Sequence, residues 1–255
     1  MTTPAPAATA SAQASHALIV DALGRRIAGG TLAEGERVTV AQLEEEFAAS
    51  RTVVREAVRV LEAHGLVVSR RRVGVTVAPR AHWRNLDGAV IAWTLDGPRR
   101  HDMLVELTAL RAAVEPAAAN AAARCAGDQD RAELVRLATR LSELGARGAG
   151  DSDDYLDVDI AYHRLLLRAG GNALFAQLAE PVTEVLRGRA ALGLTPGIPH
   201  VGTLEAHLAT AQAIAAGDAA AAESAARTHL TLVSSEVGSD RPVAMPQPGV
   251  SDYAE

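Results

Sequence analysis

The chain has little sulfur and no long apolar run. Its 255 residues include one cysteine, Cys125, so no disulfide can form within the chain, and we expect a reducing, cytoplasmic environment. No apolar run approaches the about 20 residues of a membrane-spanning helix, which argues against a membrane partner. Residues 1–14 contain no basic residue and no apolar segment, so they do not resemble a signal peptide. We expect disordered tails over residues 1–14 and 238–255.

Aromatic residues and excess positive charge are also scarce. Aromatics make up 3% of the chain and hydrophobic residues 48%, so small aliphatic side chains must build the core. The net charge is -6, but residues 15–80 carry 10 arginines against 8 acidic residues, whereas the remainder carries 15 against 23. The acidic total therefore does not exclude nucleic acid. Because the excess of +2 is modest, base contacts and paired sites must matter more than overall charge.

An arginine-bearing helix is predicted between Ser50, a suitable N-cap, and Gly65, a suitable stop. Its apolar positions recur at i, i+3, i+4 and i+7, and they are Val54, Ala57, Val58 and Leu61. A second face carries Arg51, Arg55 and Arg59, with Thr52 beside them. Guanidinium groups suit phosphate oxygens and guanine edges, so this face is a candidate DNA-contacting surface.

A short β-hairpin is predicted directly after this helix. Residues 66–69 and 75–77 form the two strands, and the tip between them carries Arg71, Arg72 and Gly74. Arginines on a helix face or in a loop are most often simply solvated. The two patterns in this order, however, favour a recognition helix followed by a β-wing.

Two further helices are predicted before the arginine helix. Ile19, Leu23 and Ile27 share one face of the first, which Gly29 and Gly30 end. The second opens with a capping box from Thr39 to Gln42. Helix, turn, recognition helix and wing together predict a winged helix-turn-helix over residues 15–80.

The remainder of the chain is predicted to be all helical. Residues 81–100 form a connector, whose residues Val90, Ile91, Trp93 and Leu95 indicate a short helix that packs on its neighbours. From residue 101 to 237 no segment alternates with period 2. Glycine-rich breaks divide it into six helices of bundle length. The expected fold class is therefore mostly α: an N-terminal winged helix-turn-helix and a C-terminal helical bundle.

Four polar residues lie on apolar helix faces of this bundle. Asp159 and His163 share a stripe on one helix, His207 lies on a second and His229 on a third. Burying such groups without partners costs on the order of 2–7 kcal/mol each. A single histidine there is usually a hydrogen-bonded core residue, but four converging groups favour a shared ligand. One carboxylate and three imidazoles suit a divalent ion, with zinc first and nickel or manganese as alternatives.

Two further residues are candidate contacts for a small acidic effector. The guanidinium group of Arg111 could donate two hydrogen bonds to a carboxylate in a bidentate contact. The ordinary alternative is an ion pair with Glu115 one helical turn away. Thr203 lies one turn before His207 and could bond an effector hydroxyl group.

The N-terminal segments also resemble a known family. LGRRIAGGTLAEGERV, LEEEFAASRTVVREAVRVLEAHGLV and RRRVGVTV are similar to the DNA-binding half of GntR-type transcription regulators over residues 16–79. The resemblance implies that Arg51, Thr52 and Arg55 touch operator DNA and that Gly74 approaches the minor groove. Some members carry a DNA-contacting arginine where this chain has Ala41, so that contact must be missing or come from another residue.

The helical segments resemble the FCD effector domain of the FadR subfamily. DIAYHRLLLRAGGN, EAHLATAQAIAAGD and AARTHL carry the resemblance, which covers residues 102–236. It implies a buried metal at Asp159, His163, His207 and His229, all of which are present, with a small carboxylate effector at an open coordination site. The segments LDGAVIAWTLDGP and ELTALRAAVEPAAANAAAR are most similar to members that sense sugar acids.

Together these observations predict a homodimeric repressor, not an enzyme, that binds a short inverted repeat in operator DNA. A small carboxylate would shift the operator affinity of the dimer. Two alternatives remain open. The metal itself could be the signal, or the four residues could activate water in a metal-dependent hydrolase. The chain has no HExxH motif and no evident general base beside the four residues, which argues against the hydrolase.

Overall fold

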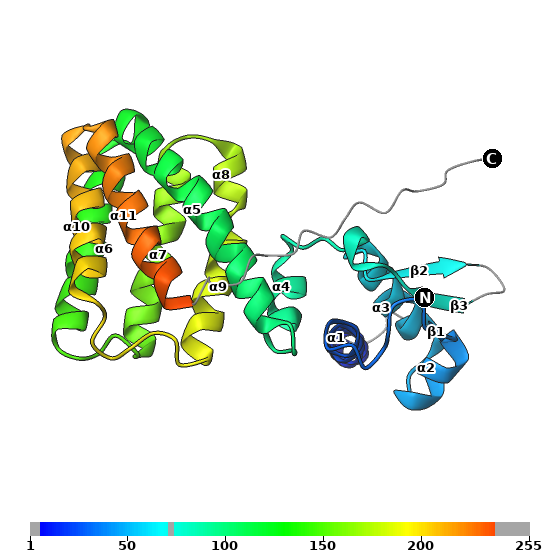
Figure 1. Cartoon of the computed structure of the whole chain (residues 1–255). Helices are drawn as coiled ribbons and strands as arrows, with labels where there is room; N and C mark the ends of the chain where they lie inside the picture. The colour runs from blue at the N-terminus through cyan, green and yellow to red at the C-terminus, as the bar shows by residue number, and fades with distance from the viewer. Residues whose placement is uncertain (1–5, 71–73, 238–255) are drawn as a thin grey trace, which may run out of the picture.

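The N-terminal part of the chain is a winged helix-turn-helix, as the sequence predicted. The computed structural model describes residues 6–70 and 74–237. The first domain contains α1 (Pro6–Ala28), β1 (Arg37–Val38), α2 (Val40–Glu46), α3 (Arg51–Ala63), β2 (Val67–Arg70) and β3 (Gly74–Val77). The strands form an antiparallel sheet in the order β1-β3-β2, which lies beside α3 (Figure 1). Its core joins the apolar faces of α1, α2 and α3 to the inner face of the sheet.

Side-chain caps fix where α2 and α3 begin. The backbone N–H of Gln42 donates to Thr39 Oγ1 at 3.2 Å, and the backbone N–H of Thr39 donates to Gln42 Oε1 at 2.8 Å. This is the predicted capping box. Ser50 caps α3 by accepting from the backbone N–H of Val53 at 3.4 Å. Both N-terminal boundaries were therefore predictable from local chemistry.

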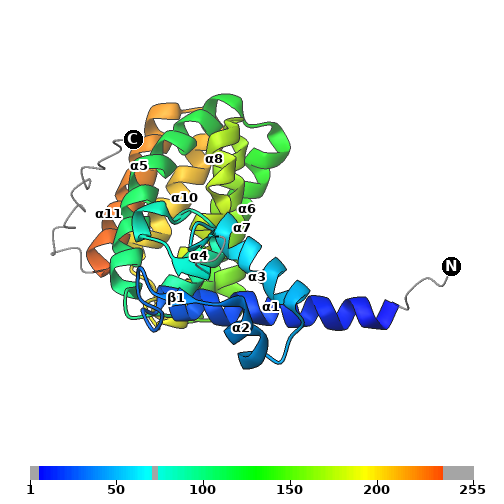
Figure 2. The same cartoon turned by 90° about the vertical axis from the view of Figure 1, so that its right-hand side faces the viewer.

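The first helix is longer than the sequence indicated. Helix α1 begins at Pro6, so residues 6–14 are helical and the expected disordered tail over them is wrong. Five of those nine residues are alanine, the strongest helix former, and proline is well tolerated in a first turn. This end of α1 projects beyond the rest of the domain (Figure 2). Residues 1–5 and 238–255, also expected to be tails, lie outside the described residues.

Seven helices make up the C-terminal part of the described chain. They are α5 (Arg100–Cys125), α6 (Asp128–Ala146), α7 (Asp153–Ala169), α8 (Ala173–Gln177), α9 (Ala179–Ala191), α10 (Val201–Ala216) and α11 (Ala219–Val237). The six long ones match the prediction, and the short α8 is additional. Its separation from α9 has a local cause: Pro181 lacks an N–H and its ring excludes the helical carbonyl position of Gln177.

Small side chains let the helices of this bundle approach closely. The central cluster is rich in buried alanines from α5, α10 and α11, among them Ala119, Ala122, Ala123, Ala211, Ala222 and Ala226. A methyl group added at Gly170 would lie 2.7 Å from the Ala121 methyl carbon, so that contact also needs a minimal side chain. Among the described residues, no helix has the length and apolar character needed to cross a bilayer.

The connector forms a joint between the two domains. It contains a 3-10 turn, η1 (Arg80–His82), and α4 (Gly88–Leu95). Val90 and Trp93 belong to the core of the winged domain, whereas Ile91 and Leu95 pack with α5 and α9. The expectation that the connector helix packs on its neighbours is confirmed. Figure 1 shows α4 between the two domains.

Trp93 attaches this joint firmly to the winged domain. Its indole N–H donates to Asp21 Oδ1 at 2.8 Å, and its ring lies edge-on to His64, which caps the C-terminal end of α3. A Cβ at Gly24 would lie 2.5 Å from the indole ring, so glycine is needed for this contact. Asp87, the N-cap of α4, also pairs with His64 at 3.1 Å.

A pair of glycine substitutions tests how the winged domain closes on the connector. Gly65 and Gly30 share nearly the same left-handed backbone, with φ +77° and +78°. A Cβ at Gly65 would lie 2.2 Å from the backbone oxygen of His82, whereas nothing lies within 4 Å at Gly30. We expect Gly30→Ala to lower the free energy of unfolding by about 1–2 kcal/mol, the cost of the backbone conformation. Gly65→Ala should cost at least about twice that, because backbone must move as well.

Urea denaturation followed by tryptophan fluorescence would measure both losses, since Trp83 and Trp93 both pack against the core of the winged domain. Equal losses in the two variants would contradict the steric contribution at Gly65.

Candidate metal centre and nucleic-acid interface

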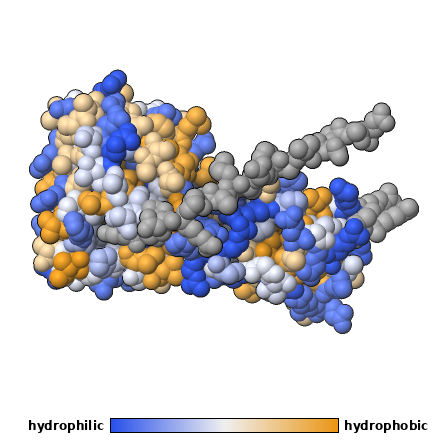
Figure 3. All heavy atoms as spheres, viewed as in Figure 1, coloured by the Kyte–Doolittle hydropathy of each residue, from blue (hydrophilic) through white to orange (hydrophobic). Residues whose placement is uncertain are grey.

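Helix α3 presents its arginines to solvent, as a DNA-contacting helix must. Arg51, Thr52, Arg55 and Arg59 are all exposed, while the apolar stripe of the same helix is buried. Arg59 pairs with Glu56, and Arg51 Nε lies 4.0 Å from Glu44 Oε1. The side chain of Arg55 makes no hydrogen bond or ion pair with the residues that the structure describes, so its guanidinium group is the most available of the three. On the face in Figure 3, hydrophilic residues gather over this domain.

The wing is described only in part. Strands β2 and β3 pair antiparallel from Val67 opposite Val77 to Arg70 opposite Gly74. Arg71 and Arg72, the expected tip residues, lie outside the described residues. Gly74 has φ +101°, and a Cβ there would lie 2.9 Å from the backbone oxygen of Val38. The sheet itself therefore requires glycine at this position, whatever its distance from DNA.

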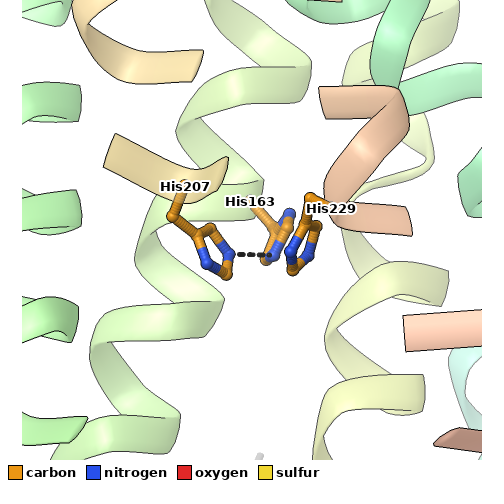
Figure 4. Close-up of side chains that lie close together, drawn as sticks. All are labelled: His163, His207 and His229. Carbon is orange, nitrogen blue, oxygen red and sulfur yellow. Dashed lines mark hydrogen bonds between the residues drawn. The ribbon is translucent and has the colours of Figure 1, made fainter. Parts of the chain in front are cut away.

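Three histidines converge inside the helical bundle. His163 comes from α7, His207 from α10 and His229 from α11, and all three are buried (Figure 4). One ring nitrogen of each lies within 4.8 Å of those of the other two. The Nε2 atoms of His163 and His207 are 3.3 Å apart. Two ligands on a tetrahedral zinc ion, each at about 2.0–2.1 Å, would be separated by about 3.4 Å, so this spacing fits an ion.

Asp159, the fourth residue that the sequence predicted, lies beside two of the three histidines. Its Oδ1 atom lies 3.4 Å from His163 Nε2 and 3.5 Å from His207 Nε2. This buried oxygen has no hydrogen-bond partner among the described residues, and neither do the two ring nitrogens of His229. A buried polar atom without a partner costs about 1–3 kcal/mol. Buried polar atoms without partners, beside the imidazoles of His163 and His207, are consistent with a cation site.

Hydrogen bonds set the orientation of His207. Its Nδ1 lies 3.1 Å from the backbone oxygen of Thr203, which can only accept, so Nδ1 carries the proton and Nε2 presents a lone pair to the cluster. Burial lowers the pKa of His207 to about 4. Burial, reinforced by His207 and His163, also holds the pKa of His229 well below its usual range. Both imidazoles are therefore neutral near pH 7, the form that binds metals.

Glu115 belongs to this cluster, although sequence reasoning gave it only as an ion-pair partner for Arg111. Arg111 Nε donates to Glu115 Oε1 at 2.6 Å, so that ordinary alternative for Arg111 is observed. The other oxygen, Oε2, lies 3.0 Å from His163 Nδ1. Burial alone would raise the pKa of Glu115, but Arg111 and His163 outweigh it and lower that pKa to about 2. Burial lowers the pKa of His163, yet Glu115 and Asp159 more than offset this and raise it.

A cavity opens next to the cluster. Including its opening to solvent it comprises about 720 Å³, and its polar lining includes Arg111, Asp151, Ser152, Asp159, Arg189, Thr195, Thr203, His207 and His229. Both expected effector contacts, Arg111 and Thr203, thus line one cavity with three of the four proposed ligands, Asp159, His207 and His229. Thr203 Oγ1 is buried and has no hydrogen-bond partner among the described residues. Two loops form part of the wall, joined where Gly150 N–H donates to the oxygen of Gly197 at 2.7 Å.

Two family models match the chain. Residues 16–77 match the bacterial regulatory proteins of the gntR family, and residues 106–232 match the FCD domain. The galactonate operon transcriptional repressor of Escherichia coli (strain K12) is 34% identical over 221 residues, which cover 85% of this chain and 93% of that protein. The HTH-type transcriptional regulator LutR of Bacillus subtilis (strain 168) is 30% identical over 213 residues, covering 81% and 94%.

A solved structure shares the fold. Lar, described as controlling the expression of the Listeria monocytogenes agr system, aligns over 87% of this chain and 95% of its own with a TM-score of 0.55. At 17% identity this likeness concerns the fold alone. The family assignment rests on the two matched domains and on sequence relatives that cover most of the chain. The chain belongs to the gntR family of bacterial regulatory proteins, with an FCD domain as its helical half, and it is a transcription regulator and not an enzyme.

Proposed function

We propose that the protein is a homodimeric repressor whose helical domain holds a divalent metal ion and a small carboxylate effector. The observation that carries this proposal is the convergence of three buried imidazoles within 4.8 Å, beside a cavity that Arg111 also lines. Asp159, His163, His207 and His229 would hold the ion. Zinc suits this nitrogen and oxygen set best, and nickel or manganese remain alternatives.

A bound divalent ion would supply a positive charge that attracts a carboxylate into the cavity. Arg111 donates to Glu115, and its NH2 group also faces the cluster, so it can add a hydrogen bond to an incoming carboxylate. The unsatisfied hydroxyl of Thr203 could bind a hydroxyl group of the same effector. The polar groups in the lining of the cavity could bind the hydroxyl groups of a polyhydroxy acid. The similarity to a galactonate operon repressor supports the sugar-acid class.

A continuous set of contacts could link the cavity to the DNA-binding helix. Leu186 and Arg189 of α9 line the cavity, and Gly188 between them packs against Leu95 of α4. At its other face α4 holds His64, at the end of α3, through Asp87 and Trp93. A shift of α9 would therefore move α4 and change the placement of α3. In a dimer, such a shift would alter the spacing of two recognition helices on an inverted repeat.

Removing two proposed ligands should abolish metal retention. We expect dialysed wild-type protein to keep about one divalent ion per chain, and His207→Ala/His229→Ala to keep none, because two of four ligands are lost. Elemental analysis would measure this. His101→Ala, at an exposed histidine on α5, is the control and should keep the ion. Full occupancy in the double variant would refute the ligand set. Ready loss of the ion from the wild type, with changed DNA affinity, would indicate a metal-responsive regulator instead.

Arg55 should contribute directly to operator recognition. We expect Arg55→Ala to weaken binding by about 1–3 kcal/mol if the guanidinium reads a base edge. The probe is a duplex selected by the wild-type protein from random sequence, and affinity is measured by fluorescence anisotropy. Arg136→Ala, an exposed arginine of α6, is the matched control and should bind normally. Wild-type affinity in Arg55→Ala would remove this residue from the interface.

Leu95 should be needed for effector response more than for effector binding. Galactonate is the first compound to test, by thermal shift and by its effect on operator affinity. We expect Leu95→Ala to bind the stabilising compound within a few-fold of wild type but to lose most of the change in operator affinity. Leu95→Met, which conserves volume, should respond normally. A full response in Leu95→Ala would show that the coupling runs elsewhere. If no small carboxylate changed operator affinity, the effector proposal itself would fail.

A further inference from the structure

We infer that Glu115 is a positioning residue for the metal centre, acting through His163. It would hold the His163 ring so that Nε2, not Nδ1, presents its lone pair to the ion. This inference rests on the proposed metal site, and it assigns a role to a residue that is not itself one of the four proposed ligands.

The two nitrogens of His163 face different partners. Nδ1 lies 3.0 Å from Glu115 Oε2. Nε2 lies 3.3 Å from His207 Nε2 and 3.4 Å from Asp159 Oδ1. A carboxylate can only accept hydrogen bonds, so Nδ1 must carry a proton. In the neutral ring Nε2 then carries the lone pair. It faces the other proposed ligands and lies 3.1 Å from the NH2 group of Arg111, which can donate to it.

The two carboxylate oxygens of Glu115 contact different side chains, Arg111 and His163. Oε1 accepts from Arg111 Nε at 2.6 Å, whereas Oε2 is 3.5 Å from Arg111 NH2 and closer to His163. The side chains of Arg111, Glu115 and His163 are each only 1% exposed, so no solvent competes for these contacts. Arg111 thus fixes the carboxylate, and the carboxylate fixes the imidazole.

Of the three histidines, His163 is the one whose Nδ1 atom is oriented by a carboxylate. His207 is oriented by a neutral backbone oxygen, and neither nitrogen of His229 has a hydrogen-bond partner among the described residues. A carboxylate partner increases the basicity of a ligating imidazole as well as orienting it, and loss of such a partner commonly costs 10–100-fold in metal affinity, as an order of magnitude. We therefore expect Glu115 to influence affinity nearly as strongly as a ligand.

The first test is Glu115→Gln. Arg111 would donate to the one remaining oxygen, so the amide NH2 group would face His163 Nδ1. Because this NH2 group donates, Nδ1 would have to accept, which favours the tautomer with its proton on Nε2. We expect metal affinity, measured by competition with a chelator, to fall by about 10–100-fold. The visible spectrum of the Co²⁺-loaded protein should also change, because the ligand field changes. Thr108→Val is the matched control and should alter neither readout. Thr108 is buried on the same helix, and its hydroxyl has no hydrogen-bond partner in the part of the chain that the structure describes.

A second set of variants separates positioning from simple charge balance. Removing Glu115 alone leaves Arg111 buried and unpaired, which can destabilise the fold. The double variant Arg111→Met/Glu115→Leu replaces the pair with apolar side chains and avoids that charge. If Glu115 only neutralised Arg111, the double variant would regain wild-type metal affinity, and the inference would be overturned. We expect it to stay about 10–100-fold weaker, because the carboxylate that orients His163 is absent.

These outcomes distinguish the two proposals. Wild-type protein that binds no metal would overturn the proposed centre and this inference with it. Wild-type protein that binds metal tightly, together with Glu115→Gln of equal affinity and unchanged Co²⁺ spectrum, would overturn the positioning role alone.

Discussion

The buried polar cluster at the centre of the helical domain is the constraint on which that domain depends. An arginine, two carboxylates and three histidines meet inside a bundle whose core is built mainly from alanine and leucine. Such groups are tolerated in a core only when partners compensate for their lost hydration. Glu115 and Arg111 satisfy each other and one side of His163. Among the described residues, buried atoms of Asp159 and His229 have no hydrogen-bond partner, and a bound ligand would satisfy them in the same way.

The same constraint explains the packing around the cluster. Three histidines from α7, α10 and α11 can meet only if those helices approach closely, and alanine at the contacts allows it. The cavity beside the cluster lies between helices and loops, and Tyr155 is part of its lining.

Helix α4 gives the molecule a mechanical connection between its halves. Val90 and Trp93 belong to the core of the winged domain, and Ile91 and Leu95 pack with α5 and α9. One face of the helix also contacts His64, at the end of the recognition helix. A joint of this kind transmits displacement because packed interfaces shift between discrete arrangements and do not deform freely. Helix α4 is tightly packed on both sides, since a methyl group added at Gly24 or Gly188 would collide with Trp93 or Leu95, respectively.

The sequence by itself determined the local structure and the identity of the candidate ligands. Capping residues, periodic apolar positions and glycine breaks act within a few residues, so α2, α3 and the six long helices were predictable, and apolar stripes exposed the unusual positions of Asp159, His163, His207 and His229. Two features were not predicted: the early start of α1 and the short α8. Over residues 6–14, helix propensity outweighed a composition that is typical of disordered tails. Tertiary structure alone decided how Arg111 and Glu115 are used. Because Arg111 and Glu115 lie one helical turn apart, the sequence predicts that they can pair. Only the packing of α5 against α7 brings the second carboxylate oxygen of Glu115 to His163. Contacts between residues distant in the chain depend on how helices pack and not on local sequence spacing.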